Sequence, residues 1–406
     1  MIAALAMKPF ILKYCAAFLA VLLLFVAPVG AQQAEAFSTR APRAFLIDGE
    51  TGAVLFAKDE NTTFAPASLA KIMTAEVVFS AVRDGSVTEE TLYKVSEHAW
   101  RTGGAPSRTA TMFAALNSEV SIGNLLRGLM VIYANDAAIV LAEGLAGSEA
   151  GFAKLMNERA GQLGLRNSVF VNPTGFPAHG QKTSVRDMAI LAHHLWKTYP
   201  VMFSRFGLAE FNWNNINQQN KNPLFKLGLG SDGLVAGFAE GEGYSIVATA
   251  ERNGRRLFLA LQGLERDSHR IDEARAMIEW GMTAFDKVEL FARDETVGEA
   301  SVFGGDRPRV KLQAKEPISV LVPVGGGDKY VGRIVYQGPI SAPLDKGAQV
   351  ASLVVYDDKL MVREVPLYAA EPVGVGTMTQ RALGAIYELA FGWFRGLMVD
   401  APARPS

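Results

Sequence analysis

Ser68 and Lys71 form a Ser-x-x-Lys pair where an extended approach turns into an apolar helix. A spacing of three residues places both side chains on one face of a helical turn, one above the other. A serine hydroxyl is a weak nucleophile at neutral pH, and a lysine amine within hydrogen-bond reach can remove its proton. The helix N-terminus adds N–H groups and partial positive charge, which suit an oxyanion and help to lower the lysine pKa. The pair indicates a serine acyl-transfer site, although the same spacing also occurs as an exposed cap beside a surface lysine.

Two other polar stretches could supply the remaining parts of such a site. Tyr133 and Asn135 fall at a break between two apolar helices, where polar side chains also occur as ordinary caps. Residues 231–238 read Ser-Asp-Gly-Leu-Val-Ala-Gly-Phe and lead into a predicted pair of strands. A serine acyl-transfer site needs a proton shuttle, a group that holds the substrate amide, and donors for the oxyanion and the substrate carboxylate. These two stretches are the candidates for those parts.

Length and composition are typical of a globular protein with more than one domain. The 406 residues are enough for two or three domains. A hydrophobic content of 49% and a charged content of 20% exclude a disordered or fibrous chain. The formal net charge of −1 gives no electrostatic basis for binding nucleic acid, so we expect no nucleic-acid partner.

The segment 1–31 is typical of a signal peptide. Two lysines precede an almost entirely apolar stretch at 15–27, and small residues precede the expected cleavage site after Ala31. A second cleavage site is conceivable at 34–36, and an uncleaved membrane helix is the alternative, although the apolar run is short for a full span. The single cysteine, Cys15, lies in this segment, so the mature chain would have no disulfide, thiol nucleophile or cysteine metal site. These features predict an exported protein of the bacterial envelope.

Residues 37–285 predict one α/β (α+β) domain. Two alternating runs around a Gly-Glu-Thr-Gly turn indicate strands at its start, and strand character returns between residues 235 and 262 with a turn at Asn253 and Gly254. Apolar residues at helical spacing predict a helical block in between and one closing helix. The expected helices cover residues 121–133, 136–145, 149–163, 184–198 and 270–285.

The remainder of the chain has a different pattern. Short alternating runs separated by glycines predict a small all-β domain over residues 287–372. A Gly-Val-Gly hinge follows, and then a helix over residues 378–398 with a wide, aromatic-rich apolar face. Such a face predicts a helix that lies in a membrane interface, and the alternative is a helix packed on its own protein.

Several segments share one family pattern almost from end to end: residues 65–74, 99–104, 125–130, 135–137, 172–175, 186–189, 280–281 and 339–347. With them, the chain resembles the D-alanyl-D-alanine carboxypeptidases of the low-molecular-weight penicillin-binding protein 5 type. The resemblance implies a penicillin-recognising serine peptidase or β-lactamase-like domain, a small all-β domain and a C-terminal amphipathic anchor. It also implies hydrolysis of the terminal D-alanine from peptidoglycan stem pentapeptides, acylation by β-lactams, and a periplasmic protein attached peripherally to the cytoplasmic membrane. Neither a cofactor nor a metal is expected.

The resemblance also implies which residues carry the reaction. Ser68 would attack the substrate carbonyl, with Lys71 as general base. Tyr133 would shuttle a proton, and Asn135 would hold the substrate amide and orient the lysine.

The substrate would lie along the strand that contains Val235, Ala236, Gly237 and Phe238. In the family's arrangement, the N–H groups of Ser68 and Phe238 form the oxyanion hole. Arg270 falls where the family has an arginine that binds the terminal carboxylate, and a surface arginine in a charged loop is the alternative.

Two departures from the family pattern affect the expected activity. Tyr133 replaces the serine of Ser-x-Asn, which a phenol can tolerate as a proton shuttle. Val235 and Ala236 replace the lysine and threonine of Lys-Thr-Gly, so a cation and a hydroxyl facing the substrate carboxylate are absent. Each such charge-assisted hydrogen bond is worth about 1.5–3 kcal/mol, and losing both weakens binding by about a hundredfold or more. Losing the cation should also raise the Lys71 pKa and leave less free amine at neutral pH.

These departures leave three hypotheses. The first is an active D,D-carboxypeptidase with a remodelled third motif, in which Arg270, Lys226 or Lys221 could partly replace the lost charge. The second is a catalytically impaired relative that binds peptidoglycan or a partner protein on the same scaffold. The third is a β-lactamase-like hydrolase, against which the extra β domain and the anchor helix argue.

Overall fold

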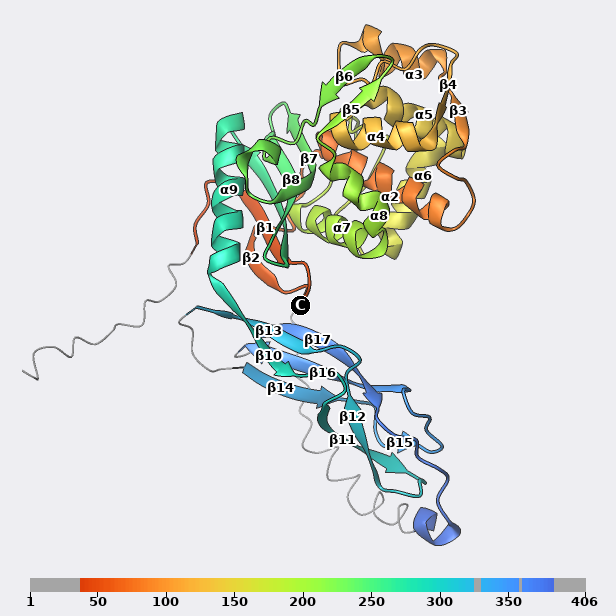
Figure 1. Cartoon of the computed structure of the whole chain (residues 1–406), viewed down its shortest axis with the longest axis vertical. Helices are drawn as coiled ribbons and strands as arrows, with labels where there is room; N and C mark the ends of the chain where they lie inside the picture. The colour runs from red at the N-terminus through yellow and green to blue at the C-terminus, as the bar shows by residue number, and fades with distance from the viewer. Residues whose placement is uncertain (1–36, 325–329, 358–359, 383–406) are drawn as a thin grey trace, which may run out of the picture.

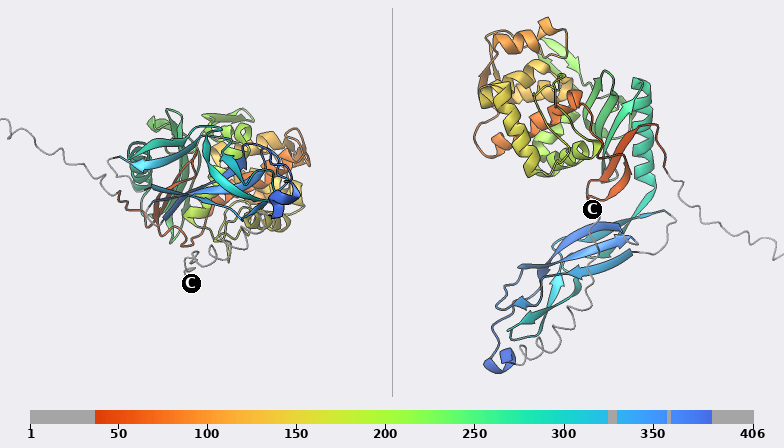
Figure 2. Two further views of the ribbon diagram at one scale, coloured as in Figure 1. Left: turned by 90° about the horizontal axis from the view of Figure 1, so that it is seen from below. Right: turned by 180° about the vertical axis from the view of Figure 1, so that it is seen from behind.

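The structure is a computed structural model that describes residues 37–324, 330–357 and 360–382. A helical body and an antiparallel sheet form an upper domain, and an elongated β domain extends from it beyond the last helix of the upper domain (Figures 1 and 2). The predicted signal peptide, residues 1–31, lies outside the described residues.

The centre of the upper domain is a five-stranded antiparallel sheet with the strand order β2-β1-β9-β8-β7. Its outer strand β7 carries the third candidate motif. The β8–β9 connection is the predicted hairpin turn, in which Asn253 and Gly254 both have positive φ, the conformation for which Asn-Gly is the preferred pair. The strands are β1 (Arg43–Asp48), β2 (Val54–Lys58), β7 (Ser231–Ala239), β8 (Gly243–Arg252) and β9 (Arg255–Leu264).

Helices cover both faces of this sheet. Alternate residues of β9 pack on opposite sides: Phe258 and Ala260 belong to the core shared with the helical body, and Leu257 and Leu259 pack on α9 (Asp267–Thr283). Figure 1 shows α9 on one side of the sheet and the helical body on the other. Burial on both faces explains why the strands read as nearly continuous apolar runs.

The helical body surrounds one buried helix, α2 (Ala70–Arg83). Its first ten residues are all buried, so it is covered on every side, as expected of a core helix. The neighbours are α4 (Ile122–Ile132), α5 (Asn135–Ala146), α6 (Glu149–Gln162) and α7 (Val185–Thr198). The predicted helices are therefore present, with ends within a few residues of those expected.

Short elements complete this domain. They are η1 (Ala67–Leu69), β3 (Leu92–Lys94), α3 (Glu97–Thr102), η2 (Ala105–Ser107), β4 (Glu119–Ser121), α8 (Pro200–Phe203), η3 (Ser204–Gly207), β5 (Glu210–Trp213), β6 (Ile216–Gln219) and η4 (Phe225–Leu227). One differs from the expectation: Ser68 lies in the 3-10 turn η1 ahead of α2, whereas the sequence placed it in the first turn of the helix itself.

The lower domain is built of strands alone within residues 285–324, 330–357 and 360–369. Strands β10 and β13 pair with each other, and the others form a sheet with the order β14-β16-β17-β12-β11-β15. A separate apolar core lies under them. The strands are β10 (Phe285–Phe291), β11 (Thr296–Phe303), β12 (Arg309–Gln313), β13 (Ile318–Pro323), β14 (Tyr330–Val335), β15 (Ile340–Ser341), β16 (Gln349–Asp357) and β17 (Leu360–Ala369).

The described chain ends in a helical turn at residues 378–382. The rest of the predicted membrane-interface helix, residues 383–398, lies outside the described residues. Among the helices that the structure describes, none is both long and apolar enough to cross a membrane.

Candidate active site

Ser68 and Lys71 lie together at the junction of the helical body and the sheet. Lys71 is 2% exposed, and its Nζ lies 3.3 Å from Ser68 Oγ and 2.6 Å from the carbonyl oxygen of Thr174. Because the serine oxygen and the amine are within hydrogen-bond reach, the pair can pass a proton between them. The predicted Ser-x-x-Lys pairing is thus present in space.

The loop that supplies the Thr174 carbonyl fits closely against the nucleophile. Asn172 Oδ1 accepts hydrogen bonds from the Gly175 N–H and the Thr174 hydroxyl, which fixes the turn. A Cβ on Gly175 would lie 1.6 Å from the Ala67 carbonyl oxygen, so only glycine fits there. From the sequence, this Asn-Pro-Thr-Gly segment is a family match without a predicted role. The hydrogen bond from Lys71 Nζ to the Thr174 carbonyl shows that this segment holds the amine in place.

The Lys71 pKa is lowered from its ordinary value of 10.5 to about 7. Burial is the main cause because the charged form loses its hydration, and the positive charge of Lys221 adds to the effect. A large fraction of Lys71 is therefore free amine at neutral pH. The expected rise of this pKa on loss of the third-motif cation stays a prediction, but burial as the main cause keeps the value low in this chain.

Tyr133 and Asn135 lie at the helix break where the sequence placed them. Tyr133 ends α4 with a left-handed backbone (φ 56°), and Asn135 is the first residue of α5. The Tyr133 hydroxyl donates to the carbonyl oxygen of Leu234 at 3.2 Å. Burial raises the pKa of this phenol, and the Ala236 backbone and the charge of Arg270 offset the increase only in part. The phenol therefore joins α4 to β7 and remains neutral.

Asn135 presents an open acceptor. The residue is 5% exposed, and its Nδ2 donates to Thr109 Oγ1 at 2.9 Å. Its Oδ1 is buried and has no partner among the described residues. A buried carbonyl without a donor is costly, and a substrate N–H would satisfy it. Its described hydrogen bond is with Thr109 rather than with Lys71, which the resemblance had expected it to orient.

Asp136 organises the loop that carries Thr109. The carboxylate is fully buried and accepts hydrogen bonds from the Thr111 hydroxyl at 2.6 Å and the N–H groups of Met112 and Ala114 at 3.0 and 3.1 Å. These bonds hold the loop against the start of α5. This role of Asp136 was not predicted from the sequence, where its place beside Asn135 at a helix start is the signal that could have indicated it.

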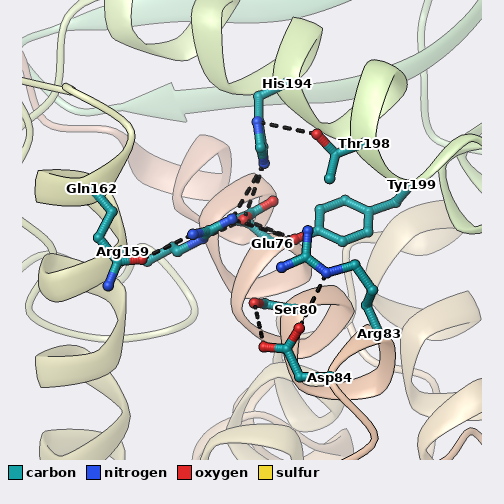
Figure 3. A network of polar contacts seen from close by, with 9 residues as sticks. All are labelled: Glu76, Ser80, Arg83, Asp84, Arg159, Gln162, His194, Thr198 and Tyr199. Atoms are coloured by element: carbon teal, nitrogen blue, oxygen red, sulfur yellow. Dashed lines mark hydrogen bonds and ion pairs between the residues drawn. The ribbon is translucent and has the colours of Figure 1, made fainter. Parts of the chain in front are cut away.

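Further along α2, the buried carboxylate of Glu76 connects three helices. Its Oε1 lies 2.6 Å from Arg159 Nε on α6 and 3.3 Å from His194 Nε2 on α7 and from the hydroxyl of Tyr199 (Figure 3). The ion pair compensates a charge that would otherwise be unfavourable in the core. This network fixes the helix that carries Lys71, and it was not predicted from the sequence.

Strand β7 forms the opposite side of the site. A Cβ on Gly237 would lie 3.5 Å from the Ser68 backbone nitrogen, so the strand passes directly beside the nucleophile. Val235 is 1% exposed and belongs to the same apolar core as Tyr133. Phe238 is 55% exposed and its ring lies 4.7 Å from that of Tyr244. The strand therefore presents apolar side chains where the family pattern has a cation and a hydroxyl.

Arg270 supports this strand from α9. The side chain is buried, and its Nη1 donates to the carbonyl oxygens of Gly237 at 3.1 Å and Ser245 at 3.3 Å, while Nη2 pairs with Asp267. Its guanidinium carbon lies 5.3 Å from the centre of the Tyr244 ring. Arg270 is thus not the surface arginine of the alternative interpretation, and most of its donors are used within the protein.

A Ser-x-x-Lys pair at the start of a central helix, beside the outer strand of an antiparallel sheet, defines the penicillin-recognising serine peptidase class. Comparison with known families agrees with this class. The family described as D-alanyl-D-alanine carboxypeptidase matches residues 30–264, and the C-terminal domain of penicillin-binding protein 5 matches residues 285–374.

Individual relatives cover most of the chain. It is 31% identical to the carboxypeptidase DacF of Bacillus subtilis, over 85% of this chain and 89% of the relative. It is 33% identical to DacC of Escherichia coli, over 89% and 92%. The crystal structure of penicillin-binding protein 5 from Haemophilus influenzae superposes with a TM-score of 0.74 at 30% identity, covering 84% of this chain and 99% of that one.

The chain belongs to the D-alanyl-D-alanine carboxypeptidase family. The predicted fold class and the prediction of a serine-type carboxypeptidase are confirmed. Within the described residues, no group of three or more His, Cys, Asp or Glu side chains could hold a metal ion.

Proposed function

We propose that this enzyme removes the terminal D-alanine of peptidoglycan stem pentapeptides through an acyl-Ser68 intermediate, and that β-lactams acylate the same serine. The observation that carries the proposal is the Lys71 amine, which lies 3.3 Å from Ser68 Oγ with its pKa lowered to about 7. A base works best when its pKa is near the operating pH, and this lysine meets that condition.

In the acylation step, Ser68 Oγ attacks the carbonyl carbon between the two terminal D-alanines and its proton passes to Lys71 Nζ. The resulting oxyanion accepts hydrogen bonds from the N–H groups of Ser68 and Phe238, which flank the close approach of β7 to the nucleophile. The C–N bond then breaks, and the leaving D-alanine amine takes a proton from the Lys71 ammonium.

In the second step, water attacks the acyl carbon of the ester. Neutral Lys71 takes a proton from that water, and the resulting Lys71 ammonium gives it to the Ser68 oxygen as the C–O bond breaks. The Thr174 carbonyl 2.6 Å from Lys71 Nζ keeps the amine directed at the site in both steps. The neutral phenol of Tyr133, bonded to Leu234, acts mainly as a structural bridge in this scheme, so the shuttle role expected for it is of secondary importance.

The substrate would be held between Asn135 and β7. The open Oδ1 of Asn135 would accept a peptide N–H of the substrate, and the strand from Val235 to Gly237 would pair with the substrate backbone. Arg270, which binds the Gly237 carbonyl, would act on the carboxylate through the strand and through its unpartnered Nε. Direct recognition of the carboxylate by residues 235 and 236 is absent, because neither side chain is charged or polar.

We further propose that the protein is exported by its signal peptide, 1–31, and held at the periplasmic face of the cytoplasmic membrane by the helix 378–398. The wide apolar face of that helix supports the proposal. Removing residues from Met378 onward should release the protein from membranes. Continued sedimentation of the truncated protein with membranes would contradict the anchor.

The function is tested by mass spectrometry of the purified mature protein after incubation with a penicillin. We expect one covalent adduct on Ser68, no adduct in Ser68→Ala, and an unchanged adduct in Ser86→Ala, which alters an exposed loop serine. Wild-type protein should also release D-alanine from a stem-pentapeptide mimic. A folded wild-type protein without adduct would exclude this mechanism and favour a catalytically impaired protein that binds peptidoglycan or a partner, which the replacement of Lys-Thr by Val235 and Ala236 would then explain.

A further inference from the structure

We propose that the cavity between the two domains is a second peptidoglycan site, which binds a stem peptide other than the one being cleaved. This inference rests on the proposed function for the class of ligand, and it adds a site outside the active-site cleft. Stem peptides of peptidoglycan combine carboxylates, the ammonium group of a diamino acid and alanine methyl groups. The cavity has side chains that match each of these features.

The cavity lies where the β1–β2 hairpin meets the lower domain. Its volume is about 570 Å³, within the range of about 300–1,000 Å³ that is usual for ligand pockets. Residues 51–55 and 57 line it from the upper domain, and parts of β10, β13 and β17 line it from the lower domain. Figure 1 shows the two domains meeting here, at the end of the sheet near β2. Since β2 and β7 are the opposite outer strands of that sheet, the cavity is separate from the cleft beside Ser68.

Ion pairs and hydrogen bonds fix the junction around the cavity. Lys287 Nζ on β10 lies 2.6 Å from Glu50 Oε1 in the β1–β2 turn. Arg255 of β9 donates from Nε to Asp48 Oδ2 at 3.2 Å, and from Nη1 to the carbonyl oxygen of Phe285 at 3.1 Å. The two acidic residues at this turn are therefore already paired with cations.

Arg363 on β17 brings a guanidinium to the cavity from the lower domain. The residue is half-buried, and its Nη1 donates to the carbonyl oxygen of Ser319. No carboxylate of the described residues forms an ion pair with it, since Asp48 and Glu50 pair with other cations. Burial lowers the pKa of this arginine, and the charges of Glu50, Asp48 and Glu316 offset the decrease only in part. A ligand carboxylate would supply the charge-assisted hydrogen bond that this guanidinium lacks.

Arg186 at the start of α7 brings a second guanidinium from the upper domain. The segment 186–189 is a family match without a role in the active site. The Arg186 N–H donates to the carbonyl oxygen of Glu60 at 3.1 Å, which fixes the residue beside the cavity. Its Nη1 lies 4.0 Å from Asp187 Oδ1, which is too far for a hydrogen bond. Arg186 therefore also has donors available for a ligand carboxylate.

The remaining side chains fit a zwitterionic peptide better than a simple anion. Glu60 and Glu364 line the cavity, one from each domain, and can pair with an ammonium group. Leu55, Val320 and Leu321 offer apolar surface for methyl groups. A phosphate would meet two carboxylates as well as two arginines, and like charges in contact are unfavourable. A peptide that carries both charges can pair with all four groups.

The place of the cavity in the molecule favours peptidoglycan over a membrane lipid. The helical turn at residues 378–382 lies at the end of the lower domain remote from the upper domain (Figure 1). A membrane bound at that end would lie away from the cavity. Peptidoglycan, in contrast, is the polymer that the active site must reach, and each polymer carries many stem peptides. Binding one stem peptide in the cavity raises the effective concentration of the others at Ser68.

The first test is cosedimentation of the full mature protein with purified peptidoglycan after penicillin has filled the active site. We expect the acylated protein to bind intact peptidoglycan, and to lose this binding on glycan strands from which an amidase has removed the stem peptides. Arg363→Met and Arg186→Met should each weaken the binding by about tenfold to a hundredfold, through loss of a charge-assisted hydrogen bond. Arg363→Lys should bind more tightly than Arg363→Met because it keeps the charge. Arg309→Met, which removes an exposed arginine from β12, should match wild type.

Turnover without penicillin adds a second readout, the release of D-alanine from intact peptidoglycan and from a soluble stem-pentapeptide mimic. Arg363→Met should raise KM for the polymer by about tenfold and leave kcat unchanged, whereas KM for the mimic should stay at the wild-type value. A purely structural role of Arg363 at the domain junction would affect both substrates alike.

The inference is overturned if Arg363→Met and Arg186→Met bind peptidoglycan as wild type does, or if binding persists undiminished on peptide-free glycan strands. A parallel loss of activity on the polymer and on the mimic would also overturn it, because the substitutions would then act through the fold. Absence of a penicillin adduct would instead contradict the proposed function, and binding measured without penicillin would still decide whether the cavity holds stem peptides.

Discussion

The two sides of the cleft differ in how far they keep the chemistry of the family. On the helical side, Ser68, Lys71 and Asn135 lie together, with an activated amine and an open acceptor. On the strand side, Val235 is part of the apolar core and Ala236 offers no polar group. Activation of Ser68 on the helical side therefore does not require the cation that binds the substrate carboxylate on the strand side. Burial sets most of the Lys71 pKa, so the base survives the loss of a cation on the opposite strand.

The two sides are nevertheless coupled through Tyr133. The family pattern has a small serine at this position and a long lysine at position 235, whereas this chain has a large phenol and a small valine. The Tyr133 hydroxyl reaches the carbonyl of Leu234, next to Val235, and both side chains belong to one core. We expect a lysine at position 235 to be poorly accommodated, because its side chain would enter the apolar core to which Tyr133 also belongs. We therefore predict that the two departures from the family pattern are linked through packing.

The largest effect should come from removing the base on the helical side. Lys71→Met should slow acylation by about a thousandfold or more, because no other neutral amine lies within reach of Ser68 Oγ in the described structure. The rate of adduct formation with a labelled penicillin measures it. Lys154→Met, an exposed lysine on α6, is the control. A wild-type acylation rate in Lys71→Met would show that the helical side does not supply the base, and would contradict the contrast drawn between the two sides of the cleft.

The next effect should come from Asn135. Asn135→Ala removes the open acceptor for the substrate amide and should lower kcat/KM for a stem-pentapeptide mimic by about a hundredfold, the value of one or two buried hydrogen bonds. Val235→Ala on the opposite strand should lower it much less, since that side chain offers no polar contact to substrate. Equal losses in both variants would mean that the strand holds the substrate as strongly as Asn135 does.

Rebuilding the family pattern should increase the rate only when both sides change together. Val235→Lys with Ala236→Thr should fail to improve acylation, because the lysine would enter the apolar core that contains both Val235 and Tyr133. Adding Tyr133→Ser should then raise the rate by about tenfold above that of the double variant. Stopped-flow acylation rates and thermal melts of both variants separate chemistry from misfolding. Improvement in the double variant alone would contradict the coupling between residues 133 and 235.

The pH profile should follow Lys71. This lysine has a lowered pKa of about 7, so the free amine that acts as base is lost as the pH falls through that value. Acylation should therefore rise by about tenfold from one pH unit below 7 to one unit above, and then level off. A profile still rising steeply toward pH 10 would show that Lys71 keeps an ordinary lysine pKa and that burial does not dominate.

The smallest effect should come from Tyr133→Phe. The phenol donates to Leu234 and remains neutral, so removing its hydroxyl leaves one carbonyl less well satisfied, at about 1 kcal/mol of stability, and changes acylation only a few fold. Chemical denaturation and acylation rates test both parts. A loss as large as that of Lys71→Met would instead identify Tyr133 as an essential proton shuttle.

The sequence alone determined the family, the order of the domains and the position of each motif on its element. Ser-x-x-Lys, the helix break at Tyr133 and the Asn-Gly hairpin depend on local spacing, and local spacing is preserved when the chain folds. Apolar periodicity likewise located α4, α5 and α7 within a few residues.

Only the tertiary structure decided how the motif residues are used. Thr174 contacts Lys71 from 103 positions away, and Arg270 binds the Gly237 carbonyl from 33 positions away. Lys221 and Asn222 lie between α4 and β7 because their hydrogen bonds to the carbonyls of Val131 and Gly233 hold the segment there. Burial and charge at Lys71 arise from segments that meet only after folding, and a pKa depends on these surroundings rather than on the neighbours in the chain.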